Sequence, residues 1–182
     1  FMEGAAAVIA QHPLPVVAAI QGAALGAGCQ LVVACDLAVA SADARIGIPA
    51  ARLGIVIGYE HIERLVLAVG PRRAGQILYT GAAVTGEVAA AWGLVNEAVP
   101  PDHLGDRVEE VAESVAAAAP LSVRGSKRGI RQVLASLSID RATDGFRVAD
   151  FDMMAAAAFA SEDLREGIRA FRERRPPRFR GA

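Results

Sequence analysis

Aromatic residues and cysteines are scarce in this sequence of 182 residues. Aromatic side chains make up 5% of it, and the two cysteines, Cys29 and Cys35, fit no zinc-binding pattern at their spacing. No secretory signal precedes them, so we expect two reduced, buried thiols in a cytoplasmic protein, with no metal site and no disulfide framework. Since no carboxylate or histidine stands beside Cys29, we interpret it as a packing residue and not as a nucleophile.

Net charge is also nearly absent, because 19 basic residues stand against 20 acidic ones. A net charge of −1 excludes a bulk attraction to nucleic acid or to a membrane surface. Residues 13–35 carry no charge and are long enough to span a bilayer. Pro15, Gln21, Gln30 and three nearby glycines interrupt them, however, which favours a strand, a turn and a helix in a soluble core.

The uncharged stretch has the order of a βαβ unit. Residues 16–20 are apolar and partly β-branched, which is typical of a strand buried on both faces. Residues 21–28 are small and predict a turn, residues 29–34 predict a helix, and residues 36–40 predict a second strand. This order implies parallel pairing with a right-handed crossover.

The rest of the chain changes from mixed to helical character. Thr85 and Gly93 are suited to begin and end a short helix, and the Gly70-Pro71 pair is suited to terminate the helix that precedes it. The sequence therefore predicts an α/β half followed by a helical half. Strands are expected over 45–48 and 94–99, and helices over 60–69, 72–79, 102–119, 122–136, about 141–160 and 161–173.

The turn before residue 29 is the segment best suited to chemistry. Backbone N–H groups at a helix start lack partners within the helix, and small side chains let a ligand oxygen approach them. Such a turn suits a phosphate or a polarised thioester carbonyl. The small residues could also serve only close packing of the helix on the strand, so spacing alone leaves both interpretations open.

The residues of this turn closely resemble the central signature of the crotonase superfamily, the enoyl-CoA hydratase/isomerase family. The resemblance extends over nearly the whole chain, through the Gly93-Leu94-Val95 stretch to the Ser161-Glu162-Asp163 start of the last helix. It implies an α/β fold of the crotonase-like (ClpP/crotonase) type, a ββα superhelix core. It assigns 1–101 to the C-terminal portion of that core and 102–182 to a helical trimerisation region, and we expect the N-terminal part of the family fold to be missing from this sequence.

The resemblance also implies a ligand and an assembly. The expected ligand is an acyl-CoA, with the coenzyme A thioester as substrate and no further cofactor, in fatty acid or other lipid metabolism. The expected assembly is a homotrimer or a hexamer made of two trimers, with no nucleic-acid or membrane partner. The thioester oxygen would rest near Gly26, Ala27 and Gly28, with the Ala27 amide as one donor and Tyr59 beside the acyl pocket.

Two positions depart from the family pattern. Hydratases of this family handle one water molecule with two glutamates, and these positions are Gln30 and Ala50 here. A carboxylate can accept and return a proton, whereas Gln only hydrogen-bonds and Ala does neither. Since each such group is worth about 10²–10⁴-fold, we expect hydratase activity to be weak or absent.

Other residues could substitute for the missing groups. Glu60 and His61 are possible acid–base substitutes within the cluster formed by Tyr59, Glu60, His61 and Glu63. The alternative is a solvated helix start whose acidic residues favour the helix dipole. Three hypotheses follow: an acyl-CoA-binding protein without efficient hydration, an active isomerase or hydratase with displaced groups, and a structural or regulatory subunit.

The end of the chain is basic. Seven arginines lie between residue 165 and the terminus. In the resembling family this region can meet the nucleotide of coenzyme A, and Arg174, Arg175 and Phe179 are our candidates for that contact. A solvated basic end is the alternative.

Overall fold

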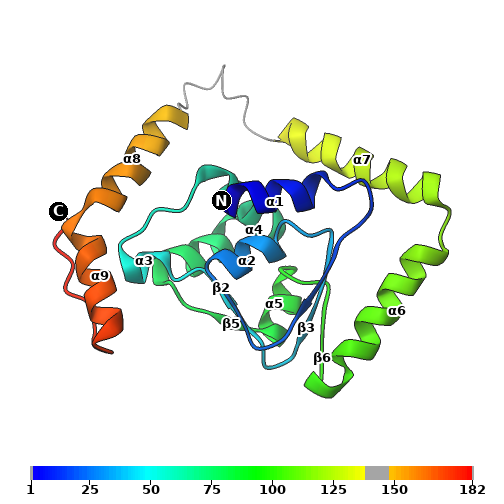
Figure 1. The fold of residues 1–182 in the computed structure, drawn as a ribbon, viewed down its shortest axis with the longest axis horizontal. Helices are drawn as coiled ribbons and strands as arrows, with labels where there is room; N and C mark the ends of the chain where they lie inside the picture. Colours follow the sequence, from blue (N-terminus) through cyan, green and yellow to red (C-terminus); the bar gives the residue numbers. More distant parts are fainter. Residues whose placement is uncertain (1, 138–147, 182) are drawn as a thin grey trace. The chain divides into compact units, whose positions relative to one another are not determined.

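The computed structural model describes residues 2–137 and 148–181, which fall into two compact units (Figure 1). The sheet unit comprises Phe1–Ile46 and Ala83–Ile139, and the helical unit comprises Gly47–Ala82 and Asp140–Ala182. Both units are discontinuous in sequence. The expected division at 101/102 into a core and a trimerisation region concerns assembly and stays a prediction.

The predicted βαβ unit is present in the sheet unit. Strand β1 (Val17–Ile20) pairs in parallel with β3 (Leu37–Ser41), and α2 (Ala27–Val32) lies between them in sequence. Strand β6 (Glu97–Val99) pairs in parallel with the other edge of β3, which gives the order β1-β3-β6. The central strand is the most buried, as its apolar sequence predicts.

A second small sheet contains a strand that the sequence did not predict. Strand β2 (Ala23–Leu25) lies inside the expected turn, in the order β2-β4-β5 with β4 (Arg45–Gly47) and β5 (Val84–Thr85). The expectation of an all-turn segment over 21–28 is therefore wrong at three of its residues. A partner distant in sequence decides the outcome, because the Arg45 N–H donates to the Gly22 carbonyl at 2.7 Å.

Helix α5 (Gly86–Trp92) begins and ends as predicted. The Thr85 hydroxyl accepts a hydrogen bond from the Val88 N–H at 3.3 Å, and Gly93 takes a left-handed φ of 78°. Its first residue lies directly against β3, where a Cβ on Gly86 would come within 2.0 Å of the Ser41 carbonyl oxygen. Glycine is therefore required at this contact.

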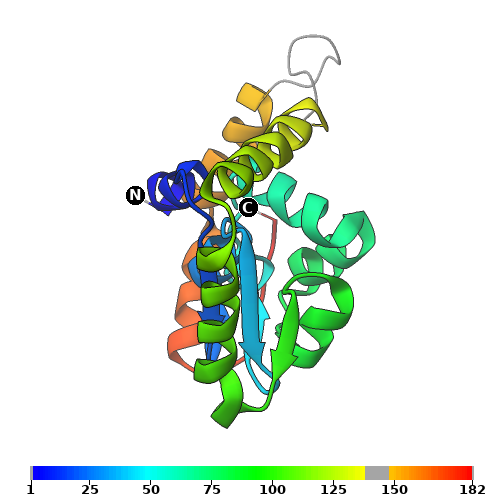
Figure 2. The same cartoon turned by 90° about the vertical axis from the view of Figure 1, so that its right-hand side faces the viewer.

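The remaining helices of the sheet unit lie at the two ends of its sequence. Helix α6 (Leu104–Ala117) follows a short 3₁₀ turn, η1 (Pro101–His103), and packs along β1 and β3 (Figures 1 and 2). Helix α1 (Met2–Gln11) packs on α2, and α7 (Pro120–Leu137) follows α6.

A buried ion pair attaches α7 to the strands. The Lys127 side chain is 6% exposed, and its Nζ donates to Asp36 Oδ2 at 2.7 Å and to the Leu14 carbonyl at 2.9 Å. The same Asp36 oxygen accepts the Val16 N–H at 2.7 Å. One carboxylate thus fixes the chain entering β1, the chain entering β3 and the middle of α7.

Four helices make up the part of the helical unit that the structure describes. Its longest helix is bent where the sequence predicts a break, because Gly70 has φ 76° and ψ 163° and Pro71 follows it. The helix expected over about 141–160 lies partly outside the described residues, within which it begins at Val148. The four helices are α3 (Ala50–Leu53), α4 (Tyr59–Thr80), α8 (Val148–Ala160) and α9 (Glu162–Arg172).

Helices α3 and α9 meet through glycines. A Cβ on Gly167 would lie 2.6 Å from the Leu53 carbonyl oxygen, and one on Gly54 would lie 2.8 Å from the Asp163 carbonyl carbon. Backbone therefore touches backbone at this contact. Separately, none of the helices in the described ranges is long and apolar enough to cross a membrane.

We predict that Asp36→Asn lowers the free energy of unfolding by about 2–3 kcal/mol, because the buried Lys127 ammonium loses its counter-charge. This decrease in the free energy of unfolding is smaller than for a fully buried ion pair, because the Asp36 side chain is 26% exposed. Urea denaturation measures it, with Glu110→Gln as the control. Glu110 pairs with Arg107 at the surface, where an ion pair is worth about 0–1 kcal/mol. Equal losses in both variants would contradict this account.

Candidate active site

The small-residue turn presents its backbone at the start of α2. Gly26 precedes the helix with φ 55° and ψ −112°, a conformation that L-residues rarely adopt. The first intrahelical bond of the turn joins the Gln30 N–H to the Gly26 carbonyl at 3.1 Å. Ala27 and Gly28 precede that bond, so their N–H groups have no intrahelical acceptor. Ala27 is exposed, so a ligand can reach this end of α2.

The two cysteines differ in environment. Burial raises the pKa of the Cys29 thiol to about 12, so it is a neutral packing group near pH 7 and not a nucleophile. Cys35 is half-buried, which corrects the expectation that both thiols are buried. Partial burial and the Asp36 carboxylate raise its pKa as well.

The two positions at which we expected the family glutamates to be replaced lie in different units. Gln30 is half-buried in the first turn of α2, in the sheet unit. Ala50 is the first residue of α3, in the helical unit, and is 9% exposed behind Pro49. The Ala50 methyl group adds apolar contact and offers no hydrogen bond.

The Tyr59 to Glu63 cluster forms the first turn of α4, also in the helical unit. Glu60 is exposed and faces Arg64 at 3.8 Å, one helical turn along, as expected for a solvated helix start. His61 is 3% exposed, so the interpretation as a solvated start does not apply to this residue. The predicted site residues therefore divide into two sets: Gly26, Ala27, Gly28 and Gln30 in the sheet unit, and Ala50, Tyr59, Glu60 and His61 in the helical unit.

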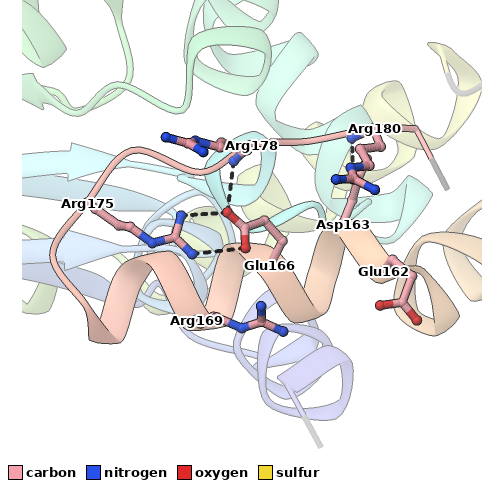
Figure 3. Close-up of a pocket in the computed structure, with 7 residues that line it drawn as sticks. All are labelled: Glu162, Asp163, Glu166, Arg169, Arg175, Arg178 and Arg180. Atoms are coloured by element: carbon pink, nitrogen blue, oxygen red, sulfur yellow. Dashed lines mark hydrogen bonds and ion pairs between the residues drawn. The ribbon is translucent and has the colours of Figure 1, made fainter.

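The basic tail folds back on α9 in the helical unit (Figure 3). Arg175 binds both oxygens of Glu166, at 2.6 and 3.0 Å, and also Glu173 at 2.6 Å. The Arg178 N–H adds a bond to Glu166 at 2.9 Å. The Arg175 guanidinium and this N–H hold the pKa of Glu166 down, at about 2. Arg175, which we expected to contact coenzyme A, is thus already paired with carboxylates.

A second carboxylate holds the end of the tail. Asp163 accepts the N–H group of Arg180 at 2.7 Å (Figure 3) and that of Gly181 at 2.8 Å. Arg174 takes a positive φ of 53°, which turns the chain back toward the helix. Asp163 and Glu166 are three residues apart and therefore share one face of α9.

The tail and α9 enclose a pocket of about 660 Å³ (Figure 3). Its other lining residues include Arg169, Arg178 and Arg180, whose guanidinium groups have no ion-pair partner within the described ranges. The candidates Arg174 and Phe179 do not line it, whereas Arg175 does. Arg169 was not predicted from the sequence, although its spacing from Glu166 indicates the same helical face.

Comparison with known proteins gives consistent results. A family model described as "Enoyl-CoA hydratase/isomerase" matches residues 3–182. A putative enoyl-CoA hydratase of Thermus thermophilus is 41% identical over 170 residues, covering 92% of this chain and 64% of that protein. A crotonyl-CoA hydratase of Syntrophomonas wolfei is 37% identical, covering 91% of this chain and 61% of that protein. The chain thus spans just under two thirds of these relatives.

A solved structure matches the whole chain. Methylmalonyl CoA decarboxylase complexed with 2S-carboxypropyl CoA superposes with a TM-score of 0.89. The match covers 100% of this chain and 68% of that one. At 24% sequence identity, the superposition shows a shared fold.

We predict that Gly26→Ala costs about 1–3 kcal/mol of stability, because the left-handed backbone before α2 strains any L-residue. Gly28→Ala is the matched control, since its added Cβ would lie 3.7 Å from the Ala24 Cβ, an ordinary contact. Thermal or urea unfolding compares the two. The prediction fails if both substitutions cost the same.

The contacts of Glu166 with the basic tail should weaken as the pH falls. The pKa of Glu166 falls from 4.5 to about 2, so its contribution is complete above pH 4.5 and is lost as the pH falls toward 2. We expect the amide of Arg178 to lose protection from hydrogen exchange across that window.

A substitution tests the same contacts at neutral pH. Glu166→Gln removes the charge that holds Arg175, so trypsin should cut after Arg178 several times faster. Glu162→Gln is the control, because Glu162 pairs with Arg165 and with no tail residue in the described ranges. Similar cleavage rates in the two variants would refute the role of Glu166.

Proposed function

Because the chain belongs to the enoyl-CoA hydratase/isomerase family, we propose that it binds an acyl-CoA thioester without hydrating it efficiently. The predicted crotonase-like α/β fold is confirmed, since the structure superposes on members of that superfamily over 96–100% of its length. The single observation that carries the proposal is that residues 30 and 50 are Gln and Ala, where the family resemblance implies two glutamates.

The thioester oxygen would be bound at the start of α2. The exposed position of Ala27 and the lack of an intrahelical acceptor for its N–H support this, because a preorganised N–H stabilises a developing oxyanion. Gly26 and Gly28 keep side chains away from the approaching oxygen. A backbone donor of this kind polarises the thioester whether or not a base is present, so binding and hydration are separable.

Loss of hydration follows from the chemistry of the two side chains. Hydration needs a group that takes a proton from water and one that delivers a proton to the substrate. Gln30 can orient a water molecule by hydrogen bonding but holds no titrating proton, and Ala50 can do neither. Removing general acid–base help costs about 10²–10⁴-fold for each group.

The nucleotide of coenzyme A would be bound by the C-terminal pocket. Arg169, Arg178 and Arg180 provide the unpaired positive charge there, while Arg175 positions the tail by binding Glu166. This proposal moves the contact from Arg174 and Phe179, which do not line the pocket, to the arginines that do.

A second candidate function is acid–base catalysis by displaced groups. The burial of His61 favours it, because a histidine withdrawn from solvent at a helix start is not explained by solvation of that start. Glu60 is a weaker candidate, since it is exposed and pairs with Arg64. The reaction would then be an isomerisation or a hydration that uses His61.

We also propose a homotrimeric or hexameric cytoplasmic protein. Exposed apolar side chains support self-association: Leu121, Ile130 and Val133 on α7, and Met153, Met154 and Phe159 on α8. The two free cysteines are consistent with a reducing compartment. Native mass spectrometry distinguishes this assembly from a structural subunit that forms complexes only with another protein.

Crotonyl-CoA tests the proposed function directly. The full chain should bind it in a calorimeter, while the enoyl absorbance decays no faster than in buffer. Installing both carboxylates, Gln30→Glu with Ala50→Glu, should raise hydration by at least about 100-fold, the lower bound for one acid–base group. Gln30→Glu with Ala50→Gln is the control that matches size without adding the second charge.

The outcomes separate the candidates. Turnover by the unaltered chain that disappears in His61→Ala would replace the proposal with the displaced-group mechanism. Turnover unaffected by His61→Ala and Glu60→Ala would contradict both. Absence of crotonyl-CoA binding would overturn the acyl-CoA proposal itself.

A further inference from the structure

A second pocket lies in the sheet unit, between the end of α1 and the exposed face of α7 (both labelled in Figure 1). It measures about 520 Å³ and is lined by Arg124, Arg128 and Arg131, with His12 and Gln132 beside them. We propose that this pocket binds an anion that carries two or more linked phosphate groups. The site is separate from every residue assigned above to acyl-CoA.

All the charged residues of α7 are basic. Its 18 residues include four cations and not one carboxylate. The buried charge of Lys127 is neutralised by Asp36. Arg124, Arg128 and Arg131 have no ion-pair partner within residues 2–137 and 148–181, so three positive charges face the pocket without compensation.

The spacing of the three arginines is costly without a ligand. Residues 124, 128 and 131 follow an i, i+4, i+7 pattern and therefore share one face of the helix. Like charges at such spacings destabilise a helix. An anion in the pocket would attract all three guanidinium groups and so offset their mutual repulsion.

The same spacing indicates the class of anion. A rise of 1.5 Å per residue places the first and last of these Cα atoms about 10 Å apart along the axis. One phosphate group is too small to meet guanidinium groups over that length while keeping their side chains extended. Two or more linked phosphates match it, and guanidinium groups bind phosphate oxygens in a bidentate manner.

The neighbouring groups supply further donors on a fixed frame. His12 Nδ1 lies 3.2 Å from the Leu14 nitrogen and 3.1 Å from the Leu14 carbonyl oxygen, so hydrogen bonding to the Leu14 backbone holds the ring beside the pocket. Lys127 holds the Leu14 carbonyl at 2.9 Å and Asp36 at 2.7 Å, so α7 is tied to the segment that follows α1. The two walls of the pocket are therefore connected by a buried interaction and do not need a ligand to meet.

Inorganic pyrophosphate is the probe for this site. Calorimetry of the full chain should show binding that weakens with added salt, as expected for charge pairing. The double variant Arg124→Gln with Arg128→Gln should weaken it at least tenfold. The matched control is Arg72→Gln with Arg73→Gln, two adjacent exposed arginines of α4, and it should change the affinity less than twofold.

Two other ligands, orthophosphate and crotonyl-CoA, test which anion the pocket binds. Orthophosphate should bind at least tenfold more weakly than pyrophosphate, and equal binding would overturn the proposed class of anion. Crotonyl-CoA affinity should change less than twofold in Arg124→Gln with Arg128→Gln, and a parallel loss would show that the pocket serves coenzyme A instead. If the α4 control lost as much pyrophosphate affinity, the binding would be a non-specific attraction to surface charge, and the proposed site would be wrong.

Folding of the variant is checked independently. The double variant should melt no lower than the unaltered chain, because it relieves repulsion on α7. If it melts lower, Arg131→Gln alone replaces it and should weaken pyrophosphate about threefold. No change in the single variant would then overturn the proposal.

Discussion

The sheet unit depends on the Asp36 carboxylate, which pairs with the buried Lys127 ammonium. Asp36 Oδ2 accepts hydrogen bonds from the Val16 N–H and from Lys127 Nζ, both at 2.7 Å. It lies just before β3, the Val16 N–H lies just before β1, and Lys127 comes from the middle of α7, about ninety residues further along the chain. The parallel strands and the distant helix are thus joined at one oxygen atom. An ammonium group that is almost fully buried requires such a partner, so the helix has little freedom to dock elsewhere.

Close backbone packing is the second constraint, and it operates within each unit separately. In the sheet unit, Gly86 brings α5 against the end of β3. In the helical unit, Gly54 and Gly167 let α3 and α9 meet through their backbones. The helix that carries Ala50 at its first residue is therefore held against the helix that carries Glu166. In this way the fold links a position of the proposed catalytic site to the α9 carboxylates that order the basic tail.

Positive charge is distributed unevenly among the arginines. Arg175 and Arg107 are paired with carboxylates and serve the structure. The guanidinium groups of Arg169, Arg178 and Arg180 in one pocket, and those of Arg124, Arg128 and Arg131 in the other, have no such pairing within the described ranges. The two pockets differ in their negative charge. The α9 pocket is lined by Glu162, Asp163 and Glu166 as well as by its arginines, whereas the α7 pocket has no carboxylate in its lining. The α7 pocket therefore gains more from an incoming anion.

The amino-acid sequence by itself determined the βαβ unit, the cap at Thr85, the break at Gly70 and the family, because these depend on local backbone preferences and on residues close together in the chain. It also identified Gln30 and Ala50 as unable to transfer protons, since that property belongs to the side chains alone. Only the tertiary structure decided that residues 23–25 form a strand, that His61 is buried, and that Arg175 is paired while Arg169 lines a pocket. The strand depends on a partner distant in sequence, which no local pattern specifies. The pairing of Arg175 and the pocket beside Arg169 depend on the turn at Arg174, which folds the tail back on α9.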